Sequence, residues 1–382
     1  MDQPTLNGSN PLPPNAWQHP GPAAFDFRSD VVTTPTASML AAITNTTLLD
    51  DVFVEDPTTT SLEAHIASLT AHPAGLLVLS GTMGNQVALR THLAAPPHGI
   101  LADARSHILE WEAGGVASLS GALAKPIHPA NGTHLTLADI KQHVVLSDDV
   151  HACPTRVIAL ENTLGGAILP LADVRAISAF AREHAIKLHL DGARLWEAVA
   201  AGAGPLDEYT TLCDSVSVCF SKGLGAPIGS MLVGDEPFIK RARHVRKAIG
   251  GGLRQAGVVS AAARIAVDET FLGGRLAGSH EMAKRVAGAW EELGGRLERE
   301  VETNMVWLDL EGSRVREEMF IEAAKRRGVR VMGGRLVVHY QIGEEAVERL
   351  KDCMAEVVKG VDEKLHDVEG GEERVGRKAY GT

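Results

Sequence analysis

The stretch SVSVCFSKGLGAPIGSML places one lysine, Lys222, in a glycine-rich turn directly after an apolar run. A buried ammonium group is costly unless it is paired or reacts. Desolvation and a nearby cation lower the pKa of a lysine, and the neutral amine can then condense with a carbonyl group. A surface lysine in a turn is the simpler explanation of this residue taken alone. Lys222 is therefore a candidate nucleophile whose assignment depends on its neighbours.

Two other segments carry polar residues where an apolar run ends. In KLHLDGARLW, Asp191 follows such a run and Arg194 comes shortly after it. A carboxylate at this place can hold a protonated nitrogen, or it can simply cap the next helix. In VLSGTMGNQVAL, Gly81 and Thr82 stand where an expected strand gives way to a helix. The free amides of a helix start form a cradle for a phosphate, although an ordinary N-cap explains the same residues.

The three signals together meet the needs of one cofactor. Pyridoxal 5′-phosphate (PLP) carries an aldehyde, a phosphate and a pyridine nitrogen. Lys222 would form the Schiff base, and Asp191 would keep the ring nitrogen protonated. Gly81 and Thr82 would hold the phosphate. Because the signals occur together, we predict a PLP site.

The elements that must position these residues alternate between helices and strands from about residue 60 to residue 270. The pattern predicts strands at GLLVLS, GILAD, TRVIALEN, IKLHLDGA, CDSVSVCFS and GSMLVG, with helices between several of them. Strands joined by helices form crossover units, so we expect an α/β fold with a mostly parallel central sheet covered by helices. Ligands bind at the carboxyl ends of such strands, which is where Asp191 and Lys222 stand.

The chain of 382 residues is long enough for two domains. We expect a large PLP-binding domain at residues 25–270 and a small C-terminal α+β domain at residues 271–365. Proline, asparagine and glycine are frequent in residues 1–24, which we expect to be a disordered N-terminal extension. Residues 366–382 are expected to form a flexible tail.

Composition limits the classes of partner. A net charge of −11 without a basic run argues against nucleic acid or an anionic membrane as partner. No signal peptide or membrane-spanning run is present, and the four cysteines have no CxxC spacing, so we expect a cytoplasmic protein with reduced thiols. The 16 histidines form no HExxH or HxH motif, so we expect no metal site. A small-molecule substrate fits best.

A series of sequence blocks resembles a known family over roughly residues 25–360, and the blocks occur in the order FDFRSDVVTTPT, DDVFVEDPTT, LSGTMGNQVALRTHL, EAGG, ALENTLGGAILPL, HLDGARLWEA, FSKGLGAPIGSMLVGD, GGGLRQAG and MGGRLVVHYQ. They are similar to those of the low-specificity L-threonine aldolases, β-eliminating lyases within the fold-type I PLP enzymes. The resemblance implies a PLP-dependent carbon–carbon lyase that cleaves L-threonine or L-allo-threonine to glycine and acetaldehyde. It also implies a homotetramer, or a dimer, with shared active sites. The activity would serve threonine catabolism and glycine biosynthesis or a specialised biosynthetic pathway, and the sequence leaves both open.

The resemblance assigns roles to two histidines. His107, which precedes EAGG, would stack on the cofactor ring, and His151 would lie near the substrate hydroxyl. An imidazole suits both places because it exchanges protons near neutral pH. Without the resemblance, both residues are explained as core histidines.

The resemblance also assigns the anion-binding residues. Ser29 and Arg335 would bind the substrate carboxylate, and Arg194 would neighbour the cofactor hydroxyl and the substrate. Arginine grips a carboxylate bidentately and thereby orients the bonds at Cα. Arg254 would help to hold the phosphate of an adjacent subunit.

Two departures from the family pattern bear on the substrate. Phe53 and Val54 stand where many members have Tyr-Gly, and Leu164 and Gly165 stand where members commonly have a histidine. Both places face the expected substrate side chain. A PLP-dependent racemase of a small amino acid such as alanine is therefore an alternative, since racemisation needs no base for a β-hydroxyl group. A binding or scaffold protein without chemistry is a further alternative, which the combined reactive residues disfavour.

Overall fold

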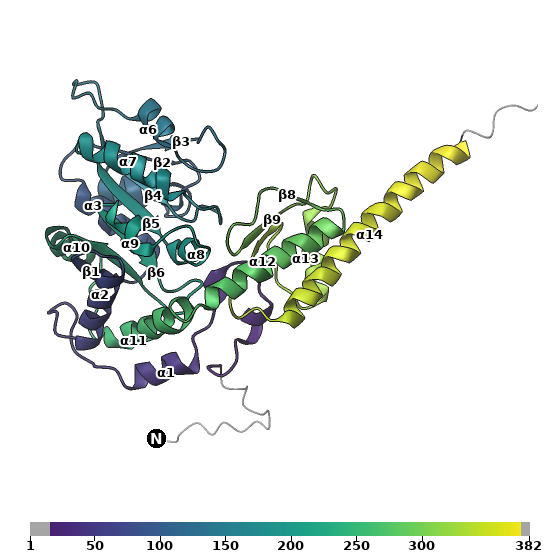
Figure 1. The fold of residues 1–382 in the computed structure, drawn as a ribbon, viewed down its shortest axis with the longest axis horizontal. Helices are drawn as coiled ribbons and strands as arrows, with labels where there is room; N and C mark the ends of the chain where they lie inside the picture. The colour runs from purple at the N-terminus through teal and green to yellow at the C-terminus, as the bar shows by residue number, and fades with distance from the viewer. Residues whose placement is uncertain (1–15, 376–382) are drawn as a thin grey trace, which may run out of the picture.

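A seven-stranded sheet lies at the centre of the larger part of the chain in the computed structural model (Figure 1), and its strands are β1 (Ala74–Val78), β2 (Gly99–Asp103), β3 (Leu123–Ile127), β4 (Thr155–Glu161), β5 (Lys187–Gly192), β6 (Ser215–Cys219) and β7 (Ser230–Gly234). The strand order is β1-β7-β6-β5-β4-β2-β3. Neighbours from β6 to β3 pair in parallel, and β7 is antiparallel to β6 and β1. The predicted α/β fold with a mostly parallel sheet is confirmed.

The structure describes residues 16–375. Most of the predicted extension, residues 1–15, and the end of the predicted tail, residues 376–382, lie outside the described residues. Six predicted apolar runs overlap β1, β2, β4, β5, β6 and β7. The strand β3, LAKPI, was missed because a lysine and a proline interrupt its apolar pattern; it lies at the sheet edge, where Pro126 is tolerated.

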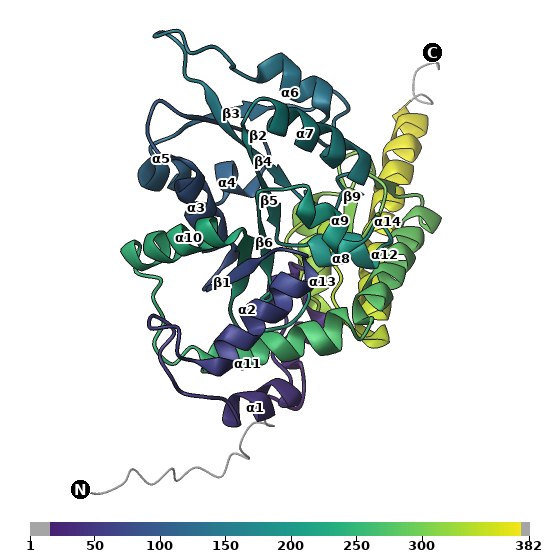
Figure 2. The same cartoon turned by 60° about the vertical axis from the view of Figure 1, so that its left-hand side comes forward.

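Helices cover both faces of the sheet (Figure 2), and those of the larger part are α1 (Ala37–Thr44), α2 (Pro57–Leu69), α3 (Gly81–His92), α4 (His107–Glu110), α5 (Gly115–Ser120), α6 (Leu137–His143), α7 (Leu171–Glu183), α8 (Leu195–Ala200), α9 (Leu206–Thr211), α10 (Glu236–Ala248) and α11 (Gly257–Ala266). Successive residues of β1 alternate between the two cores. Leu76 and Val78 pack in a cluster with α3 and α10, while Leu77 belongs to the cluster that contains α2, α7 and α11. This alternation is the pleat of a strand buried on both faces.

The smaller part follows α11 and consists of α12 (Arg275–Glu292), β8 (Arg296–Leu297), β9 (Met305–Asp309), α13 (Glu317–Arg326), β10 (Arg335–Val337) and α14 (Glu344–Val375). Its three strands form an antiparallel sheet in the order β10-β9-β8. Trp290 and Phe320 are fully buried in its core. The segment RVMGGRLVVHYQI contains one strand, β10, and α14 extends well away from the rest of the molecule (Figure 1).

An N-terminal segment connects the two parts. Phe27 is buried in the core of the smaller part, and its carbonyl accepts a hydrogen bond from the amide of Val337 at 2.8 Å. A few residues later, the Thr33 hydroxyl donates to the backbone carbonyl of Lys222 at 2.7 Å. The segment therefore fixes the smaller part beside the carboxyl ends of the parallel strands.

Within residues 16–375, no helix combines the length and the hydropathy that crossing a membrane requires.

Candidate active site

Lys222 and the predicted phosphate cradle lie together. Lys222 follows β6, and a Cβ atom added to Gly81 would lie 3.9 Å from its Nζ and 2.7 Å from the Sγ of Cys219. Only glycine therefore allows α3 to start this close to the lysine. Ser80 is an ordinary N-cap, since its hydroxyl accepts from the amide of Met83 at 3.1 Å. The hydroxyl of Thr82 has no hydrogen-bond partner among residues 16–375, which leaves it available to a phosphate.

A buried hydrogen-bonded pair, Glu197 and His280, supports the turn that carries Lys222. A Cβ atom on Gly223 would lie 2.4 Å from Oε1 of Glu197, so this carboxyl packs directly against the turn. The other oxygen, Oε2, is 2.7 Å from Nε2 of His280 on α12. Burial raises the pKa of Glu197, and the hydrogen bond and charge of His280 oppose that rise. Helix α12 of the smaller part therefore stabilises the lysine turn through Glu197.

Asp191 is held in place by two donors. It is 4% exposed, its Oδ2 accepts from Nδ2 of Asn85 at 2.7 Å, and its Oδ1 accepts from the amide of Ala193 at 3.0 Å. These bonds fix the carboxylate at the sheet edge that Lys222 also occupies. A carboxylate so held suits the protonated nitrogen that the sequence predicts for it.

His107 belongs to the same hydrogen-bonded group. Its Nδ1 is 2.7 Å from Oε1 of Glu112, and the same oxygen accepts from Nδ2 of Asn85 at 2.8 Å. One polar atom each of His107, Glu112 and Asp191 lies within 4.8 Å of the others, a spacing that a metal ion could also bridge. Because Asn85 already binds both carboxylates, we assign these residues to positioning rather than to a metal.

Glu161 is a site residue that the sequence analysis missed. It ends β4 and is the register partner of Asp191 on β5, and its Oε2 accepts from the amide of His107 at 2.8 Å. Part of the residue remains accessible, but its carboxyl group is buried. Burial and the neighbouring charge of Asp191 raise the pKa of Glu161 to about 8, against the opposing effects of the His107 amide, Lys222 and Arg194. Glu161 therefore keeps its proton at neutral pH.

Arg194 forms a bidentate ion pair with Asp30. Its Nε donates to Oδ2 at 2.8 Å and its Nη2 donates to Oδ1 at 2.6 Å. Burial alone would raise the pKa of Asp30, but the charge and hydrogen bonds of Arg194 lower it to about 2. Ser29 lies beside this pair, with its hydroxyl 3.4 Å from Oδ1 of Asp30. The pair brings the N-terminal segment, which carries Ser29, to the sheet edge.

Arg335 is a guanidinium without an acidic partner within residues 16–375. Its Nη1 donates to the carbonyl of Arg28 at 3.2 Å. Burial lowers the pKa of Arg335, and so does Arg194, while Asp30 opposes both. An arginine that lies near Arg194 and has no acidic partner in the described part of the chain is suited to bind a substrate carboxylate.

Two residues to which the family resemblance assigns roles, His151 and Arg254, lie outside this group in a single chain. His151 is exposed on a loop, where its Nδ1 is 2.8 Å from Oδ1 of Asp149. Arg254 is also exposed and pairs with Asp50 at 2.9 Å, and Phe53 nearby is 69% exposed. The roles assigned to them would need a second subunit or a rearranged loop.

Sequence reasoning missed Asp30, Asn85, Glu112 and Glu161. Each is in or beside a motif block, but a carboxyl or amide there is also an ordinary capping residue. For Glu161, the sequence contained one signal that could have identified it: it lies at the end of a predicted strand, as Asp191 does.

The pKa of Glu161 predicts a dependence of stability on pH. The folded protein keeps this carboxyl protonated up to about pH 8, whereas the unfolded chain ionises it above its ordinary value of 4.5. The folded state therefore binds more protons in this window, and stability falls as the pH rises through it. In Glu161→Gln the amide keeps an acceptor for the His107 amide but cannot ionise, so the variant should lose this part of the dependence.

The measurement is urea unfolding of the cofactor-free protein at pH 5 and pH 9. We expect the unfolding midpoint of Glu161→Gln to fall less between the two pH values than that of the unaltered protein. Glu300→Gln, which changes an exposed carboxyl, is the control and should behave like the unaltered protein. An equal fall in all three proteins would show that Glu161 ionises normally.

The comparisons with known proteins agree with this geometry. Residues 26–313 match the family model of the beta-eliminating lyases. The chain is 60% identical to aldolase vrtJ of Penicillium aethiopicum, over 90% of this chain and 88% of that protein. It is 47% identical to alanine racemase TOXG of Cochliobolus carbonum, over 90% of each, and 44% identical to the low-specificity L-threonine aldolase of Eremothecium gossypii, over 91% of each.

A solved threonine aldolase from Leishmania major has the same fold, with a TM-score of 0.74 and 21% identity over 87% of this chain and 99% of that one. The residues at the sheet edge fit PLP, because Gly81 leaves room at a helix start that faces the Lys222 amine and Asp191 is fixed beside it. The chain belongs to the beta-eliminating lyase family and is a PLP-dependent lyase of fold type I.

Proposed function

We propose that the protein cleaves L-threonine or L-allo-threonine between Cα and Cβ to give glycine and acetaldehyde. The observation that carries the proposal is the amine of Lys222 facing the helix start at Gly81, on the edge that holds Asp191. The relatives named aldolases, at 60% and 44% identity, support this reaction.

Bound PLP would supply a conjugated ring that accepts the electron pair of the Cα–Cβ bond. Lys222 would bond the aldehyde, Gly81 and Thr82 would hold the phosphate, and Asp191 would hold a proton on the ring nitrogen. Its bonds to Asn85 and Ala193 support that role, because they keep the carboxylate in one orientation.

The substrate would be held by its carboxylate. Arg335 lacks an acidic partner among the described residues, and Ser29 lies near it on the N-terminal segment. A fixed carboxylate orients Cα so that one bond stands perpendicular to the cofactor ring. Arg194 would contribute its charge while remaining paired with Asp30.

Retro-aldol cleavage also requires removal of the β-hydroxyl proton. The Nδ1 of His107 is engaged by Glu112, so Nε2 is the nitrogen available to move a proton. His151 is exposed in the single chain, so we propose His107 as the principal proton carrier and His151 as a second one only in an assembled oligomer.

A PLP-dependent racemase is the second candidate. The alanine racemase relative at 47% identity supports it, as does the absence of an imidazole at Leu164 and Gly165. Racemisation needs proton transfer at Cα alone and leaves Cβ untouched.

We further propose a homo-oligomer, a dimer or a tetramer, in which Arg254 reaches the phosphate of an adjacent subunit. Its exposure, and that of Phe53, supports this arrangement. A place in threonine catabolism and glycine biosynthesis, in the cytoplasm, completes the proposal.

The direct test is product analysis with PLP present. We expect acetaldehyde from L-threonine or L-allo-threonine, measured with a coupled alcohol dehydrogenase, and we expect its loss in Lys222→Ala because this change removes the amine that faces the cradle. Lys240→Ala, at an exposed lysine, should retain full activity. Deuterium incorporation at Cα of alanine, with no acetaldehyde from either substrate, would favour the racemase instead.

The shared site is tested by mixing two inactive variants, Lys222→Ala and Arg254→Ala. If Arg254 serves a neighbouring subunit, a mixed dimer contains one doubly altered site and one intact site. Random reassociation should therefore recover about a quarter of the original activity. Activity that stays at the level of the separate variants would mean that Arg254 does not complete a neighbour's site.

A further inference from the structure

The turn after β4 lies where the family resemblance expects a histidine, and in this chain it is built from Leu164, Gly165, Gly166 and Ala167. Two backbone hydrogen bonds of 3.1 Å between Leu164 and Ala167 close it. Gly165 and Gly166 have φ angles of +59° and +89°, a region that side chains disfavour. The turn begins three residues after Glu161, and Leu164 and Ala167 line a small pocket together with Glu161, so the turn borders the site described above.

The smaller part of the molecule donates hydrogen bonds to the two central carbonyls of this turn, those of Gly165 and Gly166. The indole Nε1 of Trp307, on β9, donates to the carbonyl of Gly165 at 2.8 Å. The hydroxyl of Thr303 donates to the carbonyl of Gly166, also at 2.8 Å. A Cβ atom on Gly166 would lie 2.7 Å from Cβ of Met305, so the contact between the turn and β9 is close.

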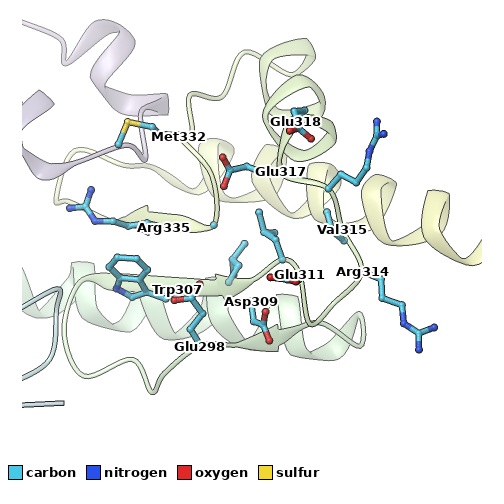
Figure 3. Close-up of a pocket in the computed structure, with 14 residues that line it drawn as sticks. Glu298, Trp307, Asp309, Glu311, Arg314, Val315, Glu317, Glu318, Met332 and Arg335 are labelled. Atoms are coloured by element: carbon cyan, nitrogen blue, oxygen red, sulfur yellow. The ribbon is translucent and has the colours of Figure 1, made fainter. Parts of the chain in front are cut away.

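The same indole lies against Arg335. Trp307 and Arg335 are register partners on β9 and β10, and their side chains lie side by side at one end of a cavity of about 760 Å³ (Figure 3). The guanidinium carbon of Arg335 is 5.9 Å from the centroid of the indole ring, and that of Arg299 is 4.6 Å from it. Two cations thus lie within cation–π distance of one aromatic ring, a contact that stabilises their orientation.

Gly165, one of the two positions where a histidine is expected, leaves little room for a side chain. A Cβ atom on Gly165 would lie 3.3 Å from Nη1 of Arg299 and 3.5 Å from Cζ2 of Trp307. A longer side chain at this position would have to displace one of them. The indole of Trp307 therefore packs directly against Gly165, and its single N–H is used by the turn.

We propose that Trp307 is a positioning residue for recognition of the substrate carboxylate, acting through Arg335, and that it fixes the turn at Gly165 at the same time. The proposal rests on the proposed binding of an amino acid by Arg335. It concerns binding, so it does not depend on which bond of the amino acid is broken. The ring of Trp307 serves Arg335 and the N–H serves the turn, so the two contacts can be separated by substitution.

The experiment compares the affinity of the PLP-loaded protein for glycine and for methylamine, which lacks the carboxylate. Both are followed by the change in the visible absorbance of the bound cofactor. In Trp307→Leu we expect the dissociation constant of glycine to rise about tenfold, the effect of one cation–π contact, with that of methylamine changed less than about twofold. Trp307→Phe keeps the ring and should retain most of the preference for glycine.

A double-variant cycle identifies the partner. In an Arg335→Ala background, the further change Trp307→Leu should leave the ratio of the two affinities unchanged. The control is Glu298→Gln, an exposed residue on the rim of the same cavity, which should not alter either affinity. Urea unfolding of Trp307→Phe and Trp307→Leu shows whether both fold.

The outcomes separate this proposal from the proposed function. If the unaltered protein releases acetaldehyde but Trp307→Leu keeps the ratio of affinities, Trp307 has no role in carboxylate recognition. The same conclusion follows if glycine and methylamine weaken equally in Trp307→Phe and Trp307→Leu. If no acetaldehyde is formed but the ratio falls as expected and the effect disappears with Arg335→Ala, the positioning role stands and the aldolase assignment fails.

Discussion

Charges gathered at the carboxyl edge of the sheet have to be paired or neutralised, and this constraint organises the site. Arg194 and Asp30 pair with each other across the N-terminal segment. The side-chain amide of Asn85 lies between the carboxylates of Asp191 and Glu112 and donates a hydrogen bond to each. The remaining carboxyl, Glu161, keeps its proton. Lys222 therefore faces an edge in which every acid already has its partner or its proton, and a bound cofactor meets a preformed arrangement.

The pairing also joins the two parts of the molecule. The N-terminal segment places Phe27 in the core of the smaller part and Asp30 at the sheet edge. Two residues of the smaller part bond the larger part. His280 bonds Glu197, which packs against the lysine turn, and Trp307 bonds the carbonyl of Gly165. Arg335 and Lys222 are thus held in fixed positions relative to each other by contacts between the two parts of the molecule.

The sequence predicted the residues whose place follows from a single element. Asp191 and Lys222 were found because each follows an apolar run, and Gly81 because it starts a helix after one. Glu161 ended a strand in the same way but was not singled out, because its role depends on its register beside Asp191. The partners Asp30 and Asn85 are distant in sequence, and only the folded chain brings them to the site. The places of His151 and Arg254 lie outside the single-chain site, so their roles stay predictions.

The central claim is that the amine of Lys222 is the group that bonds an aldehyde cofactor at this edge. The most direct test is reduction of the PLP-loaded protein with borohydride, followed by proteolysis and mass spectrometry of the peptides. The account predicts a pyridoxyl group on Lys222 in the peptide that contains SKGLGAPIG, and none on other lysines. A label on another lysine, or one spread over several exposed lysines, would contradict it.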